Sequence, residues 1–211
     1  MMILDPDMDE KGIADKKEEP TAQHLTALVL AAGLSKRMGI INKLLLLVDG
    51  EPMLQHVIHA LIASTIDQII VVLGHEADQV QTIVPNHPKL STIINVDYRL
   101  GMSTSIKAGV SQLDPATEGC LICLGDMPYL STSEYNQLLE YASTNSDPGM
   151  ILRPRFEQMG GHPVFFGKAY FPFLKNLGDR DLGAQVILRE HVNSIQYIEM
   201  TSDHCLLDID Q

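Results

Sequence analysis

Basic side chains gather just after the first strongly apolar segment of the chain. Residues 28–39 read Leu-Val-Leu-Ala-Ala-Gly-Leu-Ser-Lys-Arg-Met-Gly, and Asn42 and Lys43 follow. Residues 20–48 contain no Asp or Glu, although the formal net charge of the whole chain is −12. Small residues after a strand let backbone N–H groups approach an anion, and basic side chains neutralise its charge. The segment therefore predicts a polyphosphate site; the alternative is an ordinary loop with exposed Lys36, Arg37 and Lys43.

A single carboxylate follows the apolar segment 120–124. Asp126 lies in Gly125-Asp126-Met127-Pro128, directly after that predicted strand. Ligands of open α/β sheets bind at the carboxyl ends of the strands, and Mg²⁺ takes one or two protein carboxylates together with phosphate and water oxygens. Asp126 is therefore a candidate Mg²⁺ ligand; the alternative is a turn in which Asp126 caps the backbone.

Two further segments carry polar groups at places where an element begins or ends. Residues 101–106 read Gly-Met-Ser-Thr-Ser-Ile, so Gly101, Ser103 and Ser105 start a helix and could donate to a ribose or a phosphate; plain helix capping is the alternative. Near the end of the chain, Asp208 and Asp210 share one face if that segment is extended. Gly161 and His162 lie in a turn before a strand, where they could line a ligand pocket or serve only the turn.

The C-x₂-C spacing of Cys120 and Cys123 does not indicate a zinc site. Residues three apart in a strand point to opposite faces of a sheet, so the two thiols would diverge. The odd number of cysteines, three, is typical of a protein in a reducing compartment.

The elements that must position these residues alternate between strand and helix patterns. Strands are predicted at 25–31, 68–73, 92–95, 120–124, 150–152, 163–166 and 195–200, with a turn at Gly160-Gly161. Helices are predicted at 52–64, 76–84, 101–113, 131–143 and 184–190, the fourth with a capping box between Ser131 and Glu134. The pattern indicates an α/β fold with a mostly parallel sheet flanked by helices.

Composition and charge exclude several classes of protein. Hydrophobic residues make up 45% of the 211-residue chain, which is sufficient for a sizeable core. The net charge of −12 argues against binding to nucleic acid or to anionic lipid. The apolar runs are too short to span a membrane, and the start of the chain lacks a secretory signal. Residues 1–22 are expected to be an acidic, disordered tail, residues 23–211 a single domain, and the location cytoplasmic.

Several motifs occur together in one order and resemble a known family. These are residues 30–39 with 42–45, Gly-Met-Ser-Thr-Ser at 101–105, Gly-Asp-Met-Pro at 125–128, Gly-His-Pro-Val-Phe-Phe-Gly at 161–167 and Leu-Asp-Ile-Asp at 207–210. The chain is similar to the MobA-like nucleotidyltransferases, and among them to the molybdenum cofactor cytidylyltransferases. The resemblance implies a three-layer, Rossmann-like fold of the nucleotide-diphospho-sugar transferase type. It also implies Mg²⁺-dependent transfer of CMP from CTP to the terminal phosphate of molybdopterin, with release of pyrophosphate.

The resemblance also implies roles for individual residues. Arg37 and Lys43 would hold the triphosphate, and Asp126 would bind Mg²⁺ together with Asp208 or Asp210. The remaining nucleotide contacts would come from the turn and the helix start, through Leu30, Ala31, Ala32, Gly33, Ser35, Gly101, Ser103 and Ser105. Gly161 and His162 would face the acceptor. The cytidylyl branch typically reads Leu-Ala-Ala-Gly where the guanylyl branch reads Leu-Ala-Gly-Gly, and residues 30–33 follow the cytidylyl pattern.

Two alternatives to this function stay open at the level of sequence. One is a guanylyltransferase or another nucleoside triphosphate transferase of the same fold, including a sugar-nucleotide transferase. The other is a non-catalytic chaperone that binds the molybdenum cofactor and passes it to a molybdoenzyme. A molybdoenzyme that receives the product is also a potential partner of the enzyme.

Overall fold

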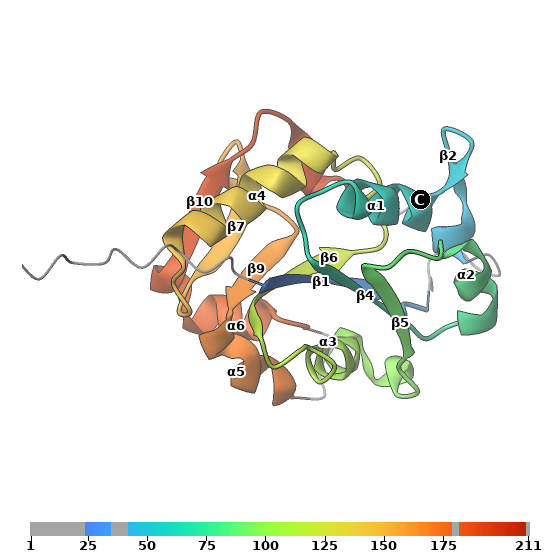
Figure 1. Cartoon of the computed structure of the whole chain (residues 1–211), viewed down its shortest axis with the longest axis horizontal. Coiled ribbons are helices and arrows are strands. Elements are labelled where there is room, and N and C mark those ends of the chain that lie inside the picture. Colours follow the sequence, from blue (N-terminus) through green and yellow to red (C-terminus); the bar gives the residue numbers. More distant parts are fainter. Residues whose placement is uncertain (1–23, 35–41, 179–181, 210–211) are drawn as a thin grey trace, which may run out of the picture.

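A twisted, mostly parallel sheet forms the centre of the molecule (Figure 1). The structure, a computed structural model, describes residues 24–34, 42–178 and 182–209. Within these ranges the main sheet has eight strands, and the path through seven of them runs β10-β7-β9-β6-β1-β4-β5. The strands are β1 (His24–Ala31), β4 (Gln68–Leu73), β5 (Leu90–Ile94), β6 (Thr117–Leu124), β7 (Ile151–Phe156), β8 (Met159–Gly160), β9 (Val164–Gly167) and β10 (Ile195–Glu199).

Strand direction changes only around β9 within the path. The pairs β1–β4, β1–β6, β4–β5 and β7–β10 are parallel, whereas β9 runs antiparallel to both β6 and β7. The short β8 folds back against β7. This arrangement confirms the α/β fold with a mostly parallel sheet that the sequence predicts.

Helices cover both faces of the sheet, which makes three layers (Figure 1). On one face, α1 (Met53–Ile62), α2 (Ala77–Ile83) and α4 (Thr132–Asn145) contribute to one apolar cluster with Cys123 of β6. On the other face, α3 (Met102–Val110), α5 (Phe171–Lys175) and α6 (Gln185–Glu190) contribute to a second cluster with Cys120. The two thiols therefore diverge to opposite faces, as the spacing predicts, and Cys120, Cys123 and Cys205 are all free and buried.

Some details differ from the prediction. Residues Leu47–Val48 and Glu51–Pro52 form an antiparallel hairpin, β2–β3, that is not predicted from the sequence. The turn after β7 lies at Glu157 and Gln158, both with positive φ (46° and 70°), and not at Gly160-Gly161. Gly160 instead pairs with Arg155 in the β7–β8 hairpin, so the predicted turn position is wrong.

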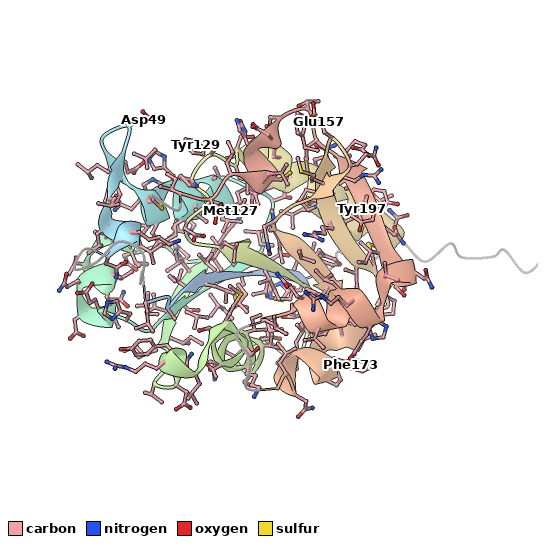
Figure 2. The ribbon with its side chains drawn as sticks, turned by 180° about the vertical axis from the view of Figure 1, so that it is seen from behind. Asp49, Met127, Tyr129, Glu157, Phe173 and Tyr197 are labelled. Carbon is pink, nitrogen blue, oxygen red and sulfur yellow. The ribbon has the colours of Figure 1, made fainter. Side chains whose placement is uncertain are left out.

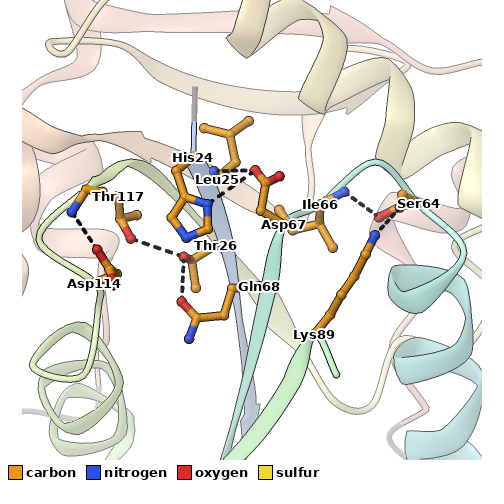
Figure 3. Close-up of polar contacts among 11 residues, drawn as sticks. His24, Leu25, Thr26, Ser64, Ile66, Asp67, Gln68, Lys89, Asp114 and Thr117 are labelled. Atoms are coloured by element: carbon orange, nitrogen blue, oxygen red, sulfur yellow. Dashed lines mark hydrogen bonds and ion pairs between the residues drawn. The ribbon is translucent and has the colours of Figure 1, made fainter. Parts of the chain in front are cut away.

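Hydrogen bonds fix the register of the three central strands at their amino ends (Figure 3). Thr26 Oγ1 lies 3.3 Å from Thr117 Oγ1 and 3.4 Å from Gln68 Oε1, which links β1 to both neighbours. The amide of Leu25 donates to Asp67 Oδ2 at 2.8 Å. These contacts lie at the amino ends of the strands, opposite to the loops that follow their carboxyl ends. None of the helices in the described ranges has the length and apolar character needed to cross a membrane.

Candidate functional site

The carboxyl ends of β1 and β6 meet at the point where the strand order changes direction. From β1 the chain passes to β4 and β5 on one side, and then returns to β6 on the other side of β1. The amide of Gly125 donates to the carbonyl of Leu30 at 3.1 Å, so the two loops that follow these strands leave side by side. Such a switch point is the place where open α/β sheets bind ligands.

Lys43 and Asp126 form an ion pair at this switch point. The Nζ atom of Lys43 bonds to Oδ2 of Asp126, and the side chains are 17% and 18% exposed, respectively. Lys43 begins a short 3₁₀ turn, Lys43–Leu45, whose N-cap Asn42 accepts from the amide of Leu44 at 3.2 Å. Both residues are predicted for one site from the sequence, and the structure brings them together.

The last described segment of the chain also reaches Asp126. The amide of Ile209 donates to the main-chain carbonyl of Asp126 at 3.2 Å, which brings the residue next to Asp208 against the end of β6. Asp210, the third acid predicted for the metal, lies outside the described residues. Mg²⁺ bound through substrate phosphates needs only one or two protein carboxylates, and Asp126 and Asp208 are hard oxygen donors of that kind. Within the described ranges no group of three or more His, Cys, Asp or Glu residues could hold a metal.

The turn after β1 is packed against the end of β4. Ala32 is buried, at 4% exposure, and the carbonyl of Ala32 accepts from the amide of His75 at 3.3 Å. A Cβ atom on Gly74 would lie only 2.7 Å from the Cβ atoms of both Ala32 and Tyr98. Because Gly74 has no Cβ atom, both Ala32 and Tyr98 can pack directly against it. The ring centroids of Tyr98 and His75 lie 6.1 Å apart. Leu30 and Ala31 complete β1, and Gly33 is exposed with open space around it.

The start of α3 is held by an internal network of polar side chains. Asn95 Nδ2 donates to Thr104 Oγ1 at 2.9 Å and to Ser105 Oγ at 3.0 Å. Ser103 and Ser105 are both buried, and Gly101 adopts a φ of 114°, which favours glycine. No side chain caps the helix at Gly101, so plain capping is not what these residues provide. Ser105 belongs to the support of the loop through Asn95.

His162 is buried next to the same centre. Its amide donates to the carbonyl of Cys205 at 2.8 Å, and its Nδ1 atom has no hydrogen-bond partner among the described residues. Burial and the charge of Arg153 lower the pKa of His162 to about 4, against an opposing effect of Asp126. The imidazole is therefore neutral at physiological pH and lies within electrostatic reach of both residues. A Cβ atom on Gly161 would lie 2.1 Å from the carbonyl oxygen of Cys205, so only glycine fits there.

A cavity of about 580 Å³ opens beside His162, on the face of the sheet covered by α3 and α6. Its volume is within the range of small-molecule sites. Apolar side chains form most of the wall: Met102, Ile106, Ile122, Leu124, Val164, Phe166, Leu182, Ala184, Leu188, Val192 and Ile195. The polar groups are Arg153, His162, Gln185, Arg189 and Tyr197, the last labelled on β10 in Figure 2.

Two guanidinium groups face this cavity without a carboxylate partner. Arg153 donates to the carbonyls of Gly161 (2.9 Å) and Gly160 (2.7 Å), and Arg189 makes only a 3.5 Å contact with Gln185. In the part of the chain that the structure describes, neither forms an ion pair, although the protein is strongly acidic. An apolar cavity with unpaired cations fits a ligand that combines a flat apolar body with an anionic group.

Some predicted site residues cannot be placed. Ser35 and Arg37, with the neighbouring Lys36, lie outside the described residues. The sequence does not predict Arg153 and Arg189 as site residues, because neither belongs to a recognisable motif.

A comparison with protein families agrees with this geometry. The model of the MobA-like NTP transferase domain matches residues 27–195, which include most of β1, the ion pair and every residue that lines the cavity except Tyr197. The chain belongs to this family. Its three layers are the nucleotide-diphospho-sugar transferase fold that the sequence resemblance implies.

Two curated relatives of this MobA-like chain have different activities. The molybdenum cofactor cytidylyltransferase of Escherichia coli is 29% identical over 186 residues, which cover 88% of this chain and 86% of that protein. The nicotine blue oxidoreductase of Paenarthrobacter nicotinovorans is 25% identical over 193 residues, covering 88% and 92%. Membership of the MobA-like family therefore does not by itself determine the reaction.

Solved structures share the fold of this MobA-like domain. Rv0371c from Mycobacterium tuberculosis superimposes with a TM-score of 0.77 at 24% identity, covering 90% of this chain and 94% of that one. A second structure of that protein, a complex with manganese, has a TM-score of 0.69 at 20% identity, covering 84% and 89%.

Proposed function

We propose that this protein is a molybdenum cofactor cytidylyltransferase, which transfers CMP from CTP to the terminal phosphate of molybdopterin. The single observation that carries the proposal is the Lys43–Asp126 ion pair at the joined ends of β1 and β6. A cation and a carboxylate held together at a switch point can bind a triphosphate and its metal. The similarity over most of both chains to the Escherichia coli cytidylyltransferase supports the choice of reaction.

The reaction needs no nucleophile from the protein. An oxygen of the acceptor phosphate, already an anion at neutral pH, attacks the α-phosphorus of CTP. A new P–O bond forms, the bond to the β-phosphate breaks, and pyrophosphate leaves. The protein must align acceptor and donor and neutralise the charge that shifts to the leaving group.

Different residues of this chain would bind the triphosphate, the nucleotide and the metal. Lys43 would leave Asp126 for the triphosphate and donate to its oxygens, with Arg37 as a second cation. Backbone N–H groups from Ala31 to Gly33, Ser35 and the start of α3, at Gly101, Ser103 and Ser105, would hold the nucleotide. Asp126 and Asp208, with Asp210, would hold Mg²⁺, which supplies charge neutralisation on the phosphates when bound. The manganese complex of Rv0371c supports a divalent metal in this fold.

The acceptor would occupy the cavity beside His162. Its apolar wall suits the ring system of a pterin better than a hexose, and Arg153 and Arg189 offer charge for phosphate. The unpartnered Nδ1 of the neutral His162 can bond to the acceptor near Asp126. These features favour molybdopterin over the sugar phosphate of a sugar-nucleotide transferase. We place the enzyme in the cytoplasm, where a molybdoenzyme would receive the product.

Release of pyrophosphate from CTP in the presence of purified molybdopterin tests the proposal directly. Release that needs both substrates and a divalent metal supports it. Release from GTP, or with glucose 1-phosphate as acceptor, would instead assign another transferase of the same fold. Binding of the nucleotide-bearing cofactor without any release of pyrophosphate would assign the chaperone alternative.

A further inference from the structure

Glu134, on the first turn of α4, makes more hydrogen bonds than helix capping requires. In the capping box, the amide of Ser131 donates to Oε2 (2.8 Å) and the amide of Glu134 donates to Ser131 Oγ (3.3 Å). Oε2 also accepts from the hydroxyl of Ser131 (2.7 Å). The same carboxylate also reaches a segment about 70 residues later: Oε1 accepts from the hydroxyl of Ser202 (2.6 Å), and Oε2 lies 3.2 Å from Nδ1 of His204. The side chain is only 12% exposed.

The distant segment is a 3₁₀ turn, η6 (Asp203–Leu206), with Ser202 as its N-cap. A serine at this position ordinarily bonds to the first amides of its own helix. Here the side chain of Ser202 makes no such bond and donates to Glu134 instead. The turn η6 is therefore hydrogen-bonded to α4, in addition to the hydrogen bonds within the turn itself.

Two groups of the candidate site depend on where η6 lies. The carbonyl of Cys205 in η6 accepts from the amide of His162, and Gly161 packs directly against that carbonyl. Beyond η6, the amide of Ile209 bonds to Asp126, so the turn leads straight to Asp208. Figure 2 shows Met127 and Tyr129, which lie between Asp126 and α4, and the ring of Tyr129 is 6.5 Å from that of His204.

We propose that Glu134 is a positioning residue for the metal site, because it fixes the turn that precedes Asp208 relative to the loop that carries Asp126. This inference rests on the proposed function, in which these two acids hold the metal. Two carboxylates that share a cation repel each other when the cation is absent, so a restraint on the backbone is needed to keep them close. Glu134 bonds at once to Ser131, after Asp126, and to Ser202, before Asp208.

Ser202→Ala separates this role from helix capping, since it removes the 2.6 Å bond from Ser202 to Glu134 and leaves both the contact with His204 and the capping box in place. We expect the dissociation constant for Mn²⁺, measured from the electron paramagnetic resonance signal of the free ion, to rise about tenfold. Hydrogen exchange at the amide of Ile209 should become faster. Ser143→Ala, an exposed serine further along α4, is the matched control and should change neither.

Glu134→Gln is the second variant, because an amide keeps the shape of the side chain without its charge. It should weaken Mn²⁺ binding at least as much as Ser202→Ala, and the KM for CTP at saturating Mn²⁺ should stay within twofold of the parent. If Ser202→Ala and Glu134→Gln match Ser143→Ala in both Mn²⁺ affinity and exchange at Ile209, the proposal is overturned.

Asp126→Asn distinguishes failure of this inference from failure of the proposed function. If Mn²⁺ binding in the parent chain does not depend on Asp126, the metal site of the proposed function is wrong. In that case the hydrogen-exchange rate at the amide of Ile209 alone tests whether Glu134 restrains the segment after η6. Faster exchange in Ser202→Ala supports the restraint, and unchanged exchange overturns it.

Discussion

The amide of Ile209 is hydrogen-bonded to the carbonyl of Asp126, although the two residues are more than 80 positions apart in the sequence. The bond joins the last described segment of the chain to the end of β6. Because Asp208 precedes Ile209, both acids predicted for the metal and present in the described residues belong to one small region.

Asp126→Asn should retain the fold and lose about 30- to 1000-fold in kcat/KM, because an amide offers no charge to the metal. Asp208→Asn and Asp210→Asn should show one severe and one mild loss. Circular dichroism checks the fold, and turnover with CTP gives the effect. Small and equal effects from all three variants would place the metal elsewhere.

Lys43→Ala should weaken CTP binding or turnover by about 30- to 1000-fold, since it removes a charge-assisted contact from a partly buried site. Arg37→Ala should act in the same direction, whereas Lys36→Ala should be mild. The control is Lys168→Ala, which removes an exposed lysine that pairs with Glu118, at the end of β6 opposite to Asp126. If Lys36→Ala is the most damaging of the set, the assignment of the loop residues is wrong.

Arg189→Ala should raise the KM for molybdopterin about tenfold and leave the KM for CTP unchanged, because Arg189 lines only the cavity. Exposed Lys175→Ala removes one positive charge from α5 and serves as the control for net charge. An equal rise in both KM values would mean that the cavity and the nucleotide site are not separate.

His162 should make the stability of the protein depend on pH. In the folded chain its pKa is about 4, whereas the ordinary value is about 6.5, so the unfolded chain binds more protons between these pH values. The free energy of unfolding should therefore fall as the pH is lowered from about 6.5 to about 4, by up to about 3 kcal/mol. In His162→Gln this part of the dependence should vanish, whereas in His59→Gln, at an exposed histidine, it should persist. Urea denaturation at pH 7 and pH 4.5 provides the measurement; equal slopes in parent and His162→Gln would contradict it.

Ala32→Gly should reduce the preference for CTP over GTP more than it reduces turnover of CTP. The Cβ atoms of Ala32 and Tyr98 both pack against Gly74, so removal of the Ala32 methyl group opens space in this turn, where a larger base could enter. One methyl group is worth about 1–3 kcal/mol, so the preference in the parent should be roughly 10- to 200-fold. Ala27→Gly, at a buried position of β1 outside the site, controls for the loss of stability. Equal kcat/KM for CTP and GTP in the parent would refute the cytidylyl assignment.

Periodicity predicts the strands and helices well because the sheet is covered on both faces. The run at Gln68–Leu73 is apolar after its first residue, and its predicted and observed bounds coincide. The turn after β7 was misplaced because Gly161 serves close packing against Cys205 and not a change of chain direction. Sequence alone does not separate these two uses of glycine.

The site was predictable where its residues follow strands, and not where they come together only in the fold. Lys43 and Asp126 follow β1 and β6, so the rule for strand ends brings them together. Arg153 and Arg189 lie on β7 and α6, and only packing of those elements makes one cavity of them. Glu134 was recognisable as a capping residue, but its bond to Ser202 depends on a contact 68 residues away.

The three buried cysteines, Cys120, Cys123 and Cys205, can serve as native probes of local unfolding. Burial raises the pKa of Cys120 to about 12 and also raises the pKa values of Cys123 and Cys205, so a thiol reagent can modify them only after the surrounding layer separates. Cys120 reports on the layer of α3, α5 and α6, Cys123 on that of α1 and α4, and Cys205 on the η6 turn. Mass spectrometry of the three labelling rates would rank how often each part of the native molecule opens, without any introduced probe.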